Sequence, residues 1–568
     1  MTAMGATSTD RVLHGVGVSP GVAAGPVLVV GEPVGEPAAT SHLGPSEDVE
    51  LSCERLAEHA SRVGDLLEAR ARSVQGAARD VLIATAAMAR DHVLLANAQA
   101  KVRVGRLTAS RAAWEAAEDV AEKFQAMGGY MGERARDVRD VRDRLVASLE
   151  KLPGPGIPDL DRPVILVARD LAPADTATLD RAMVRAIVTV EGGPTSHMAI
   201  LARSLGIPAV VAVRDVTRVL ASAQEVIVDG SLGTVDIDPS REAIEQITNR
   251  ARSRRARSFD GVGRTRDGHR IQLLANVATS ADAHAAASAG AEGVGLLRTE
   301  LCFPDDTEPS IEAQAQAYLA VLAEFPGRKV VVRTLDAGAD KPIAYLTAPH
   351  EPNPALGMRG IRTARDHPDV LNRQLQAIAA AAQAADADVW VMAPMVATVA
   401  EAREFVAACH RHELGTAGVM IEVPGAALLA DDILASAAFA SIGTNDLTQY
   451  TMAADRLLGS LADLSTCLEP AVLRLIDGVC RAGARRRRGV GVCGEAASDP
   501  AAAVVLAGLG VSSLSMNPNA LAMVATVLAD TPLVRCRELA RAALTADSAE
   551  AARDAVRGGL PILDELGL

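Results

Sequence analysis

The sequence predicts an α/β multidomain protein in which an N-terminal α/β domain with an inserted helical bundle precedes a C-terminal (β/α)8 barrel of the TIM type. Three observations lead to this prediction. Short apolar strands flank a long proline-free segment in the first 240 residues. A charged, helix-forming segment follows. The remaining residues, about 300 of them, alternate eight short apolar strands with Ala-rich helices, which is the usual length and order for such a barrel.

The N-terminal part contains strands on both sides of a helical segment. VAAGPVLVV (22–30) precedes it, and RPVILVARD, RAIVTV, AVVAV and QEVIVDG follow Pro158. No proline occurs from Ser46 to Leu152, and apolar residues there recur three and four apart, which predicts a helical bundle. GVGVSPG (15–21) lacks the register of a dinucleotide-binding loop and is predicted as a turn. We place the α/β domain at 1–40 and 150–240 and the bundle at 41–149.

The charged segment REAIEQITNRARSRRARSF is predicted to form a linker helix within residues 241–262, and the barrel occupies residues 263–568. Eight barrel strands are predicted at 270–276, 292–297, 329–335, 389–394, 418–422, 439–443, 489–493 and 511–515.

Composition excludes several function classes. The formal net charge is −14 and aromatic residues make up 2%, so a dominant nucleic-acid role is not expected. No apolar run approaches the ~20 residues that cross a bilayer, and no secretory signal is readable, which predicts a cytoplasmic protein without membrane insertion. The seven cysteines are scattered without a CxxC pair and are predicted to be reduced thiols.

Polar residues gather where the barrel strands end, and active sites of such barrels lie at those ends. The carboxylates of Glu422 and Asp446, with the amide of Asn445 beside them, are hard oxygen ligands suited to Mg²⁺. Planar guanidinium groups that match phosphate and carboxylate oxygens come from Arg298, Arg333, Arg359, Arg362 and Arg456. The predicted ligand is a small, highly anionic phospho-acid, although any one of these arginines could equally form a structural ion pair.

Three further residues each allow two interpretations. Lys341 is a second substrate cation or a surface lysine, and taken alone the surface interpretation is favoured. Cys493, between glycines at a strand end, is either core or a group that exchanges a proton with substrate, and nearby arginines would favour its thiolate. His197 follows Gly192 and Gly193 at a helix N-terminus, where it can accept a phosphoryl group or merely lie at the surface.

The sequence resembles enzyme I of the bacterial phosphoenolpyruvate:sugar phosphotransferase system over essentially its whole length. The segment HGVGVSPGVAAGPVLVV (14–30) near the N-terminus is similar to that family as well. The motifs that carry the resemblance are GGPTSHMAILARSLGIP (192–208), EGVGLLRTE (292–300), RTLDAGADK (333–341), NPALGMRGIR (353–362), MIEVPGAA (420–427), SIGTNDLTQYTMAADR (441–456) and VCGEAASDP (492–500).

The resemblance implies a role for each matching residue. His197 would carry the phosphoryl group, and Cys493 would protonate the enolate carbon to give pyruvate. Glu422 and Asp446 would hold Mg²⁺. The bundle would dock HPr, a small histidine phosphocarrier, the barrel would form a homodimer, and the 241–259 segment would be the hinge that lets His197 reach the barrel. The residues implied to bind or surround phosphoenolpyruvate are Arg298, Arg333, Arg359, Asn445, Asp446, Arg456 and Lys341.

Two departures and two alternatives accompany the resemblance. Ala172 stands where the family often has a hydroxyl, and Leu457 with Leu458 replaces a polar pair. Pyruvate phosphate dikinase and phosphoenolpyruvate synthase share the histidine domain and barrel, but too few residues precede His197 for their nucleotide-binding domain. A non-catalytic regulator is the other alternative, against which the intact site residues argue.

Overall fold

A computed structural model describes residues 12–568 of the chain, with internal gaps. The gaps are 20, 31–33, 73–76, 128, 153–155, 159, 172–178, 180–181, 193–196, 221–222, 231, 256, 302–306, 339–342, 344, 348–350, 457–460 and 462–463. The chain divides into two compact units, residues 1–251 with 567–568, and residues 252–566.

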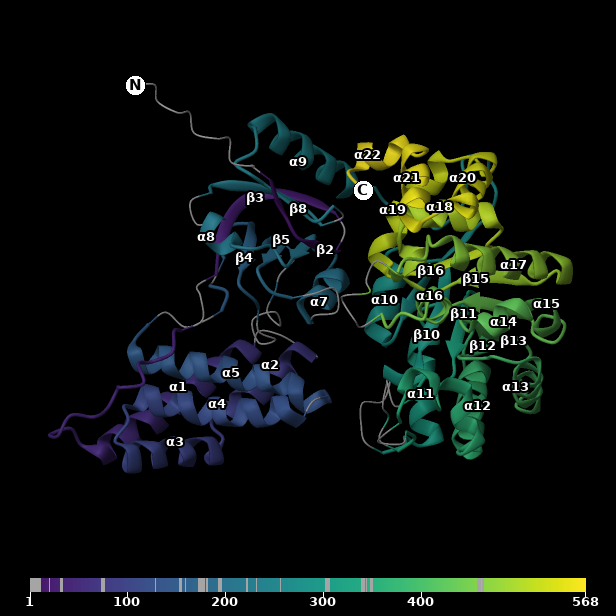
Figure 1. The fold of residues 1–568 in the computed structure, drawn as a ribbon. Helices are drawn as coiled ribbons and strands as arrows, with labels where there is room; N and C mark the ends of the chain where they lie inside the picture. The colour runs from purple at the N-terminus through teal and green to yellow at the C-terminus, as the bar shows by residue number, and fades with distance from the viewer. Residues whose placement is uncertain are drawn as a thin grey trace, which may run out of the picture. The chain divides into compact units, whose positions relative to one another are not determined.

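The first unit contains an eight-stranded sheet with the order β1-β8-β7-β3-β4-β5-β6-β2. Figure 1 labels β2, β3, β4, β5 and β8 of this sheet. Its parallel centre consists of β3 (Val22–Val29), β4 (Val164–Ala168), β5 (Val184–Thr189) and β6 (Ala209–Val211). Central parallel strands are apolar because both faces are covered. Accordingly, Leu166 and Ile187 belong to one buried cluster, whereas Val167 and Val188 belong to another. The antiparallel strands are β1 (Val12–His14), β2 (Val16–Ser19), β7 (Glu225–Asp229) and β8 (Thr234–Ile237).

The five strands predicted from apolar runs in this unit are confirmed, but β1, β2 and β8 were not predicted. GVGVSPG is not a turn, because its residues 16–19 form β2 beside β6. The glycines permit a close approach: a methyl group added at Gly17 would lie 2.3 Å from the carbonyl oxygen of Gly230. Short strands whose partners are remote in sequence carry little local signal.

The proline-free segment forms helices, as predicted. They are α1 (Val49–Ala71), α2 (Ala77–Ala89), α3 (His92–Gly105), α4 (Ala109–Met127) and α5 (Gly129–Glu150). One stretch, Val81–Gly105, is long and apolar enough by composition to cross a membrane. It comprises parts of two helices that meet at Asp91, whose carboxylate caps α3 by accepting from the backbone N–H of Val93 at 2.9 Å. Leu82 and Leu94 of this stretch are buried in the bundle core.

Three helices complete the first unit and lead out of it. They are α7 (His197–Leu205), α8 (Val216–Leu220) and α9 (Arg241–Arg255). The last of these is the helix predicted from the charged segment before the barrel.

The second unit is built around a closed parallel barrel in which β16 pairs with β9, so the sheet has no edge. Each of the eight predicted strands is present, which confirms the barrel. The strands are β9 (Gln272–Val277), β10 (Gly293–Arg298), β11 (Lys329–Arg333), β12 (Asp388–Ala393), β13 (Ala417–Ile421), β14 (Phe439–Ile442), β15 (Gly489–Val492) and β16 (Ser513–Met516).

Helices follow the strands and pack outside them. They are α10 (Ser280–Ser288), α11 (Ile311–Leu322), α12 (Pro368–Ala384), α13 (Val399–Arg411), α14 (Pro424–Leu428), α15 (Ala430–Ile433), α16 (Thr444–Met452), α17 (Pro470–Arg486), α18 (Pro500–Leu509), α19 (Leu521–Asp530), α20 (Leu533–Thr545), α21 (Ala549–Gly558) and α22 (Pro561–Leu566). Their starts are encoded locally: Thr279 and Thr398 each form a capping box with an acidic residue three positions later.

A glycine in the barrel tests the packing. A methyl group at Gly418 of β13 would lie 2.4 Å from the ring of Phe439, which is itself buried and packed on Trp390. Gly418→Ala is expected to lower the free energy of unfolding by about 1–3 kcal/mol because the ring has no room to move. Gly415→Ala is the control, since nothing lies within 4 Å of its added carbon. Denaturant midpoints of both variants decide the matter, and equal midpoints would contradict the packing argument.

Candidate active site at the barrel mouth

The carboxyl ends of β10 and β11 place two arginines side by side. Arg298 ends β10 and Arg333 ends β11, and the two residues are partners in the strand register. Arg298 is exposed, whereas Arg333 is buried. Strand pairing therefore brings together two cations that are 35 positions apart in the sequence, at the end of the barrel where active sites lie.

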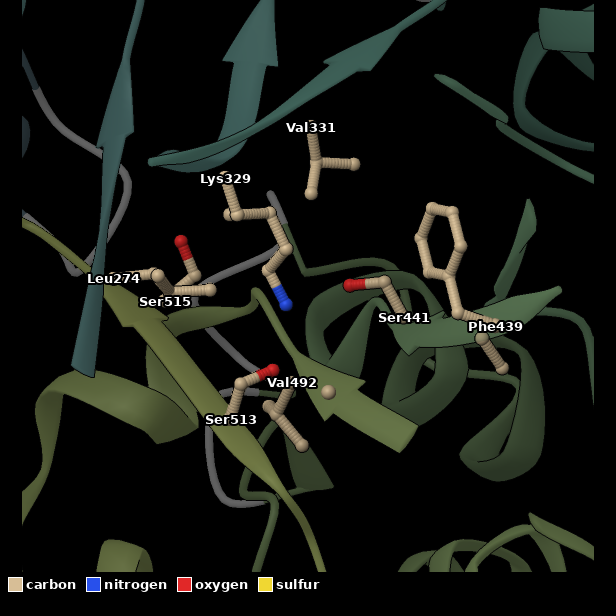
Figure 2. Close-up of a pocket in the computed structure, with 11 residues that line it drawn as sticks. Leu274, Lys329, Val331, Phe439, Ser441, Val492, Ser513 and Ser515 are labelled. Carbon is tan, nitrogen blue, oxygen red and sulfur yellow. The ribbon is translucent and has the colours of Figure 1, made fainter. Parts of the chain in front are cut away.

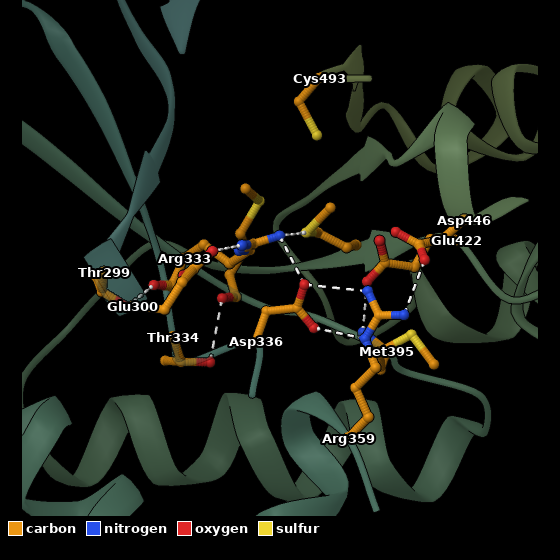
Figure 3. Close-up of polar contacts among 12 residues, drawn as sticks. Thr299, Glu300, Arg333, Thr334, Asp336, Arg359, Met395, Glu422, Asp446 and Cys493 are labelled. Atoms are coloured by element: carbon orange, nitrogen blue, oxygen red, sulfur yellow. Dashed lines mark hydrogen bonds and ion pairs between the residues drawn. The ribbon is translucent and has the colours of Figure 1, made fainter. Parts of the chain in front are cut away.

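Buried ion pairs link Arg333 to a second arginine. Arg333 contacts the carboxylates of Glu300 and Asp336, the latter at 3.2 Å. Asp336 is fully buried and also accepts from Arg359, whose Nε and Nη2 lie 3.1 and 3.2 Å from its two oxygens. Figure 3 shows Asp336 between the two guanidinium groups. Burial opposes the charge of Arg333, but these carboxylates outweigh it and raise its pKa.

Arg359 has no exposed surface, and its N–H groups donate hydrogen bonds to other buried or half-buried side chains. Besides Asp336 it donates to Asp446 at 2.9 Å and to the Tyr450 hydroxyl at 3.3 Å. Arg456 reaches the other oxygen of Asp446 at 3.6 Å. The predicted substrate contact of Arg359 stays a prediction, and the structure gives this side chain a second task, which is to orient Asp446.

Glu422 lies at the end of β13 and is buried beside this network. Its carboxylate accepts a hydrogen bond from the backbone N–H of Met395 at 2.7 Å. Burial, followed by the negative charges of Asp446 and Asp336, raises its pKa to about 8, and Arg333 opposes this effect. A cation bound between two buried carboxylates would reduce the electrostatic repulsion between them.

The donor set fits Mg²⁺ better than a metal that is held only by protein. Among the residues described, no group of three or more His, Cys, Asp and Glu side chains has the geometry of a metal site. Mg²⁺ commonly uses one or two carboxylates and completes its shell with waters and substrate oxygens. Glu422 and Asp446 can supply such a pair.

Unpaired polar atoms at the mouth also point to a bound polar ligand. In the described part of the chain, Nε of Arg333, Oε2 of Glu300 and Oγ1 of Thr444 are buried without a hydrogen-bond partner. An unsatisfied buried polar atom costs about 1–3 kcal/mol, so proteins retain few of them. The free N–H of Arg333 is a donor for an anionic oxygen.

Cys493 follows β15 and is buried at the same end of the barrel. Its thiol lies 3.7 Å from the carbonyl oxygen of Ile442 and forms a hydrogen bond with Ser441. Burial raises its pKa to about 11, and this outweighs Ser441, Arg333 and Arg298, which act in the opposite direction. The arginines do act toward the thiolate, as expected, but burial, together with the negative charge of Glu422, outweighs them and favours the protonated thiol.

Asn445 joins two of the loops. Its side-chain oxygen accepts from the backbone N–H of Glu495 at 3.0 Å, which ties the start of α16 to the loop after Cys493. The structure thus brings together, around one barrel mouth, the predicted residues Arg298, Arg333, Arg359, Glu422, Asn445, Asp446, Arg456 and Cys493.

Other predicted residues lie outside the described part or in the first unit. Lys341, Ala172, Leu457 and Leu458 fall in the gaps. His197 is the first residue of α7, after the β5 strand and after Gly192, whose φ of +106° is a left-handed turn that favours glycine. The predicted helix start at His197 is therefore confirmed, whereas Gly193 and residues 194–196 lie outside the described residues.

Sequence reasoning missed Glu300, Asp336 and a polar network behind them. The Gln374 side chain accepts from the backbone N–H of Leu335 at 3.0 Å and donates to the hydroxyls of Thr299 and Tyr318. Thr299 in turn donates to the carbonyl oxygen of Arg333 at 2.9 Å. Glu300 and Asp336 do lie within the EGVGLLRTE and RTLDAGADK motifs, whereas Gln374, on α12, has no such signal.

Comparison with known families matches this architecture in three consecutive segments. The matching models are described as the N-terminal part of PEP-utilising enzymes (14–134), their mobile domain (160–233) and their PEP-binding domain (252–532). The barrel and its mouth thus fall in the segment that matches the PEP-binding domain, and the helix that begins with His197 falls in the mobile domain. The class defined by fold and site is that of the PEP-utilising enzymes.

Individual relatives narrow this class. The Streptomyces coelicolor phosphoenolpyruvate-protein phosphotransferase is 48% identical over 97% of this chain and 99% of its own length. Proteins of the same name from Haloferax volcanii (42% identical, 78% of this chain and 80% of that one) and Geobacillus stearothermophilus (36%, 91% and 93%) also match. The chain belongs to the phosphoenolpyruvate-protein phosphotransferase family, as the motifs indicated.

The central carboxylate of the network can be tested by removing its charge. Asp336→Asn leaves Arg333 and Arg359 without their shared partner and is expected to lower the free energy of unfolding of the barrel by about 3–5 kcal/mol. Asp431→Asn is a matched control, because Asp431 also contacts two arginines, Arg485 and Arg486, but at the surface. Surface ion pairs contribute little. Similar unfolding midpoints for the two variants would refute the proposed weight of Asp336.

Proposed function

We propose that this protein is a phosphoenolpyruvate-protein phosphotransferase, which transfers the phosphoryl group of phosphoenolpyruvate to its own His197, releases pyruvate, and then phosphorylates a histidine of the carrier HPr. The observation that carries the proposal is the match along 97% of the chain to a relative of that name, together with the assembled barrel mouth. In the bacterial phosphotransferase system this reaction is the first step of sugar uptake.

The barrel mouth binds the substrate through its arginines. Arg298, Arg333 and Arg456 neutralise the phosphate and carboxylate oxygens, with the free N–H of Arg333 as one of the donors. Phosphoryl transfer has a loose transition state, so charge stabilisation and positioning account for most of the catalysis. Glu422 and Asp446 would hold Mg²⁺, which would supply further positive charge toward the phosphate. Arg359 keeps Asp446 in place, while Asn445 and Lys341 complete the substrate contacts.

Proton and phosphoryl transfer use different residues. A ring nitrogen of His197 attacks phosphorus, the bond to the bridging oxygen breaks, and enolpyruvate leaves as an enolate. Cys493 then gives its thiol proton to the methylene carbon, which yields pyruvate. The raised pKa of the thiol, about 11, suits a donor that must stay protonated until the enolate forms.

The remaining parts of the chain have assigned tasks in this proposal. Residues 1–40 and 150–240 carry the phosphohistidine, 41–149 dock HPr, 241–262 link the parts, and 263–568 bind phosphoenolpyruvate and form a homodimer. The protein acts in the cytoplasm, where HPr and phosphoenolpyruvate are available.

Labelling with phosphoenolpyruvate tests the reaction. Purified protein incubated with labelled phosphoenolpyruvate and Mg²⁺ is expected to take up acid-labile label on His197 and pass it to added HPr. His197→Ala is expected to lose the label. His284→Ala is the control and should keep it, because His284 is an exposed histidine paired with Glu324.

Cys493→Ala is expected to slow pyruvate release by at least about a hundredfold. Cys480→Ala, which changes a buried cysteine on α17, is the control and should not slow it. Label from ATP instead would favour a dikinase, and binding without label or pyruvate would favour a regulator.

The metal assignment has its own test. Chelation of Mg²⁺ is expected to stop pyruvate release, and readdition should restore it. Glu422→Gln is expected to raise the Mg²⁺ concentration for half-maximal activity about tenfold or more, because one oxygen ligand loses its charge. Glu401→Gln is the control, since the Glu401 carboxylate is used by the capping box of α13 and by an ion pair with Arg365. Unchanged Mg²⁺ dependence in Glu422→Gln would remove this residue from the metal site.

A further inference from the structure

A lysine points into the interior of the barrel below the proposed active site. Lys329 is the first residue of β11, at the end opposite the mouth, and Val331 and Arg333 share its face of the strand because side chains alternate. Figure 2 shows its amino group in the space between the hydroxyls of Ser441 and Ser513. Such an interior is normally filled by apolar side chains.

A small cavity separates the lysine from the serines. Its volume is about 20 Å³, and its polar lining comes from Lys329, Ser441, Ser513 and Ser515. That volume is sufficient for one water molecule with several polar partners. Glycines leave the room for these hydroxyls: a methyl group at Gly491 would lie 2.6 Å from Oγ of Ser513, and one at Gly295 would lie 2.4 Å from Oγ of Ser515.

Ser441 connects this cavity to Cys493. The thiol itself donates to the carbonyl oxygen of Ile442, and the Ser441 hydroxyl lowers the pKa of the thiol by acting as a hydrogen-bond donor toward the sulfur. Ser515 differs, because its hydroxyl donates to Asn276 at 2.6 Å and Asn276 donates to the carbonyl oxygen of Cys493, so it supports the backbone and not the thiol. Ser441 is therefore the hydroxyl of the cavity that can exchange a proton with sulfur.

The surroundings of Lys329 leave its charge poorly compensated. Burial lowers its pKa to about 8, while Asp388 of β12 and Glu292 before β10 act in the opposite direction through space. The Trp390 ring lies 4.3 Å from Nζ and favours the ammonium. Strands β14 and β16 contribute the neutral hydroxyls of the cavity, and the next charge along the strand of Lys329 is Arg333. An apolar side chain would fill this position without the desolvation cost, so packing alone does not explain a lysine here.

We propose that Lys329 restores the proton of Cys493 after each turnover, through a cavity water and the Ser441 hydroxyl. This rests on the proposed function, in which the Cys493 S–H bond breaks as a C–H bond forms on the enolate. The thiolate takes the Ser441 proton, Ser441 oxygen takes one from the water, and the water takes one from the ammonium. Neutral Lys329, which is partly exposed, regains a proton from solvent. The path leaves the substrate-filled mouth untouched.

Comparison of first and later turnovers tests the relay. The first turnover uses the proton already on Cys493, so label transfer from phosphoenolpyruvate to His197 in Lys329→Met and Ser441→Ala is expected at nearly the wild-type rate. Steady-state pyruvate release with HPr in excess is expected to fall about tenfold or more in both. Ser513→Ala, in the same cavity but without a contact to the thiol, is the control and should change by less than about twofold.

The pH profile separates a proton donor from a structural cation. Wild-type steady-state turnover is expected to fall as the pH rises through about 8, where the Lys329 ammonium is lost, and this fall should be missing in Lys329→Met. Lys329→Arg keeps the charge but holds its proton too tightly, so it should not restore the rate. Equal slowing of first and later turnovers, rescue by arginine, or wild-type behaviour of Ser441→Ala would each overturn the relay. If wild-type protein takes no label at all, the proposed function fails instead.

Discussion

The buried carboxylate of Asp336 is the interaction on which the barrel mouth depends. It holds Arg333 from one strand end and Arg359 from the loop that precedes α12, and neither arginine can stay charged and buried without a partner. Arg359 also forms an ion pair with Asp446 and so fixes the position of its carboxylate. Asp446 is the residue that we assign to both metal binding and substrate binding. A single buried charge thereby fixes the relative positions of side chains from three segments of the barrel.

The same burial sets the protonation states of the site. Desolvation and the neighbouring acidic side chains raise the pKa of Glu422 and favour its neutral form. A bound cation would therefore stabilise the ionised carboxylate. Cys493 is kept as a thiol although arginines lie near it, because it is enclosed at the end of β15. Exclusion of water therefore has two effects on the site. The buried carboxylates are stabilised by a nearby positive charge, and the sulfur of Cys493 keeps its proton. Both effects suit the protonation of an enolate after phosphoryl transfer.

Much of this could be predicted from the sequence. The apolar strands of the barrel are short, repeated and separated by Ala-rich helices, so each one is visible locally, and the motif at 441–456 already places Asn445 and Asp446 after a strand. His197 at a helix start follows from the glycines before it. In contrast, β1, β2 and β8 were not predicted, because each is only three or four residues long. The partners of β1 and β2 are also remote in sequence, whereas β8 directly follows its partner β7.

Tertiary structure alone decided which polar residues share a charge. In the sequence, nothing distinguishes Asp336 and Glu300 from the other residues of their motifs. The folded barrel buries both carboxylates against Arg333. Gln374 becomes part of the site only because α12 packs behind β11. The interior position of Lys329 depends on strand register and on glycines in two other strands. Local pattern determines which residues form strands and where polar groups follow them, whereas desolvation and pairing depend on atoms brought together from distant positions, which a linear sequence does not contain.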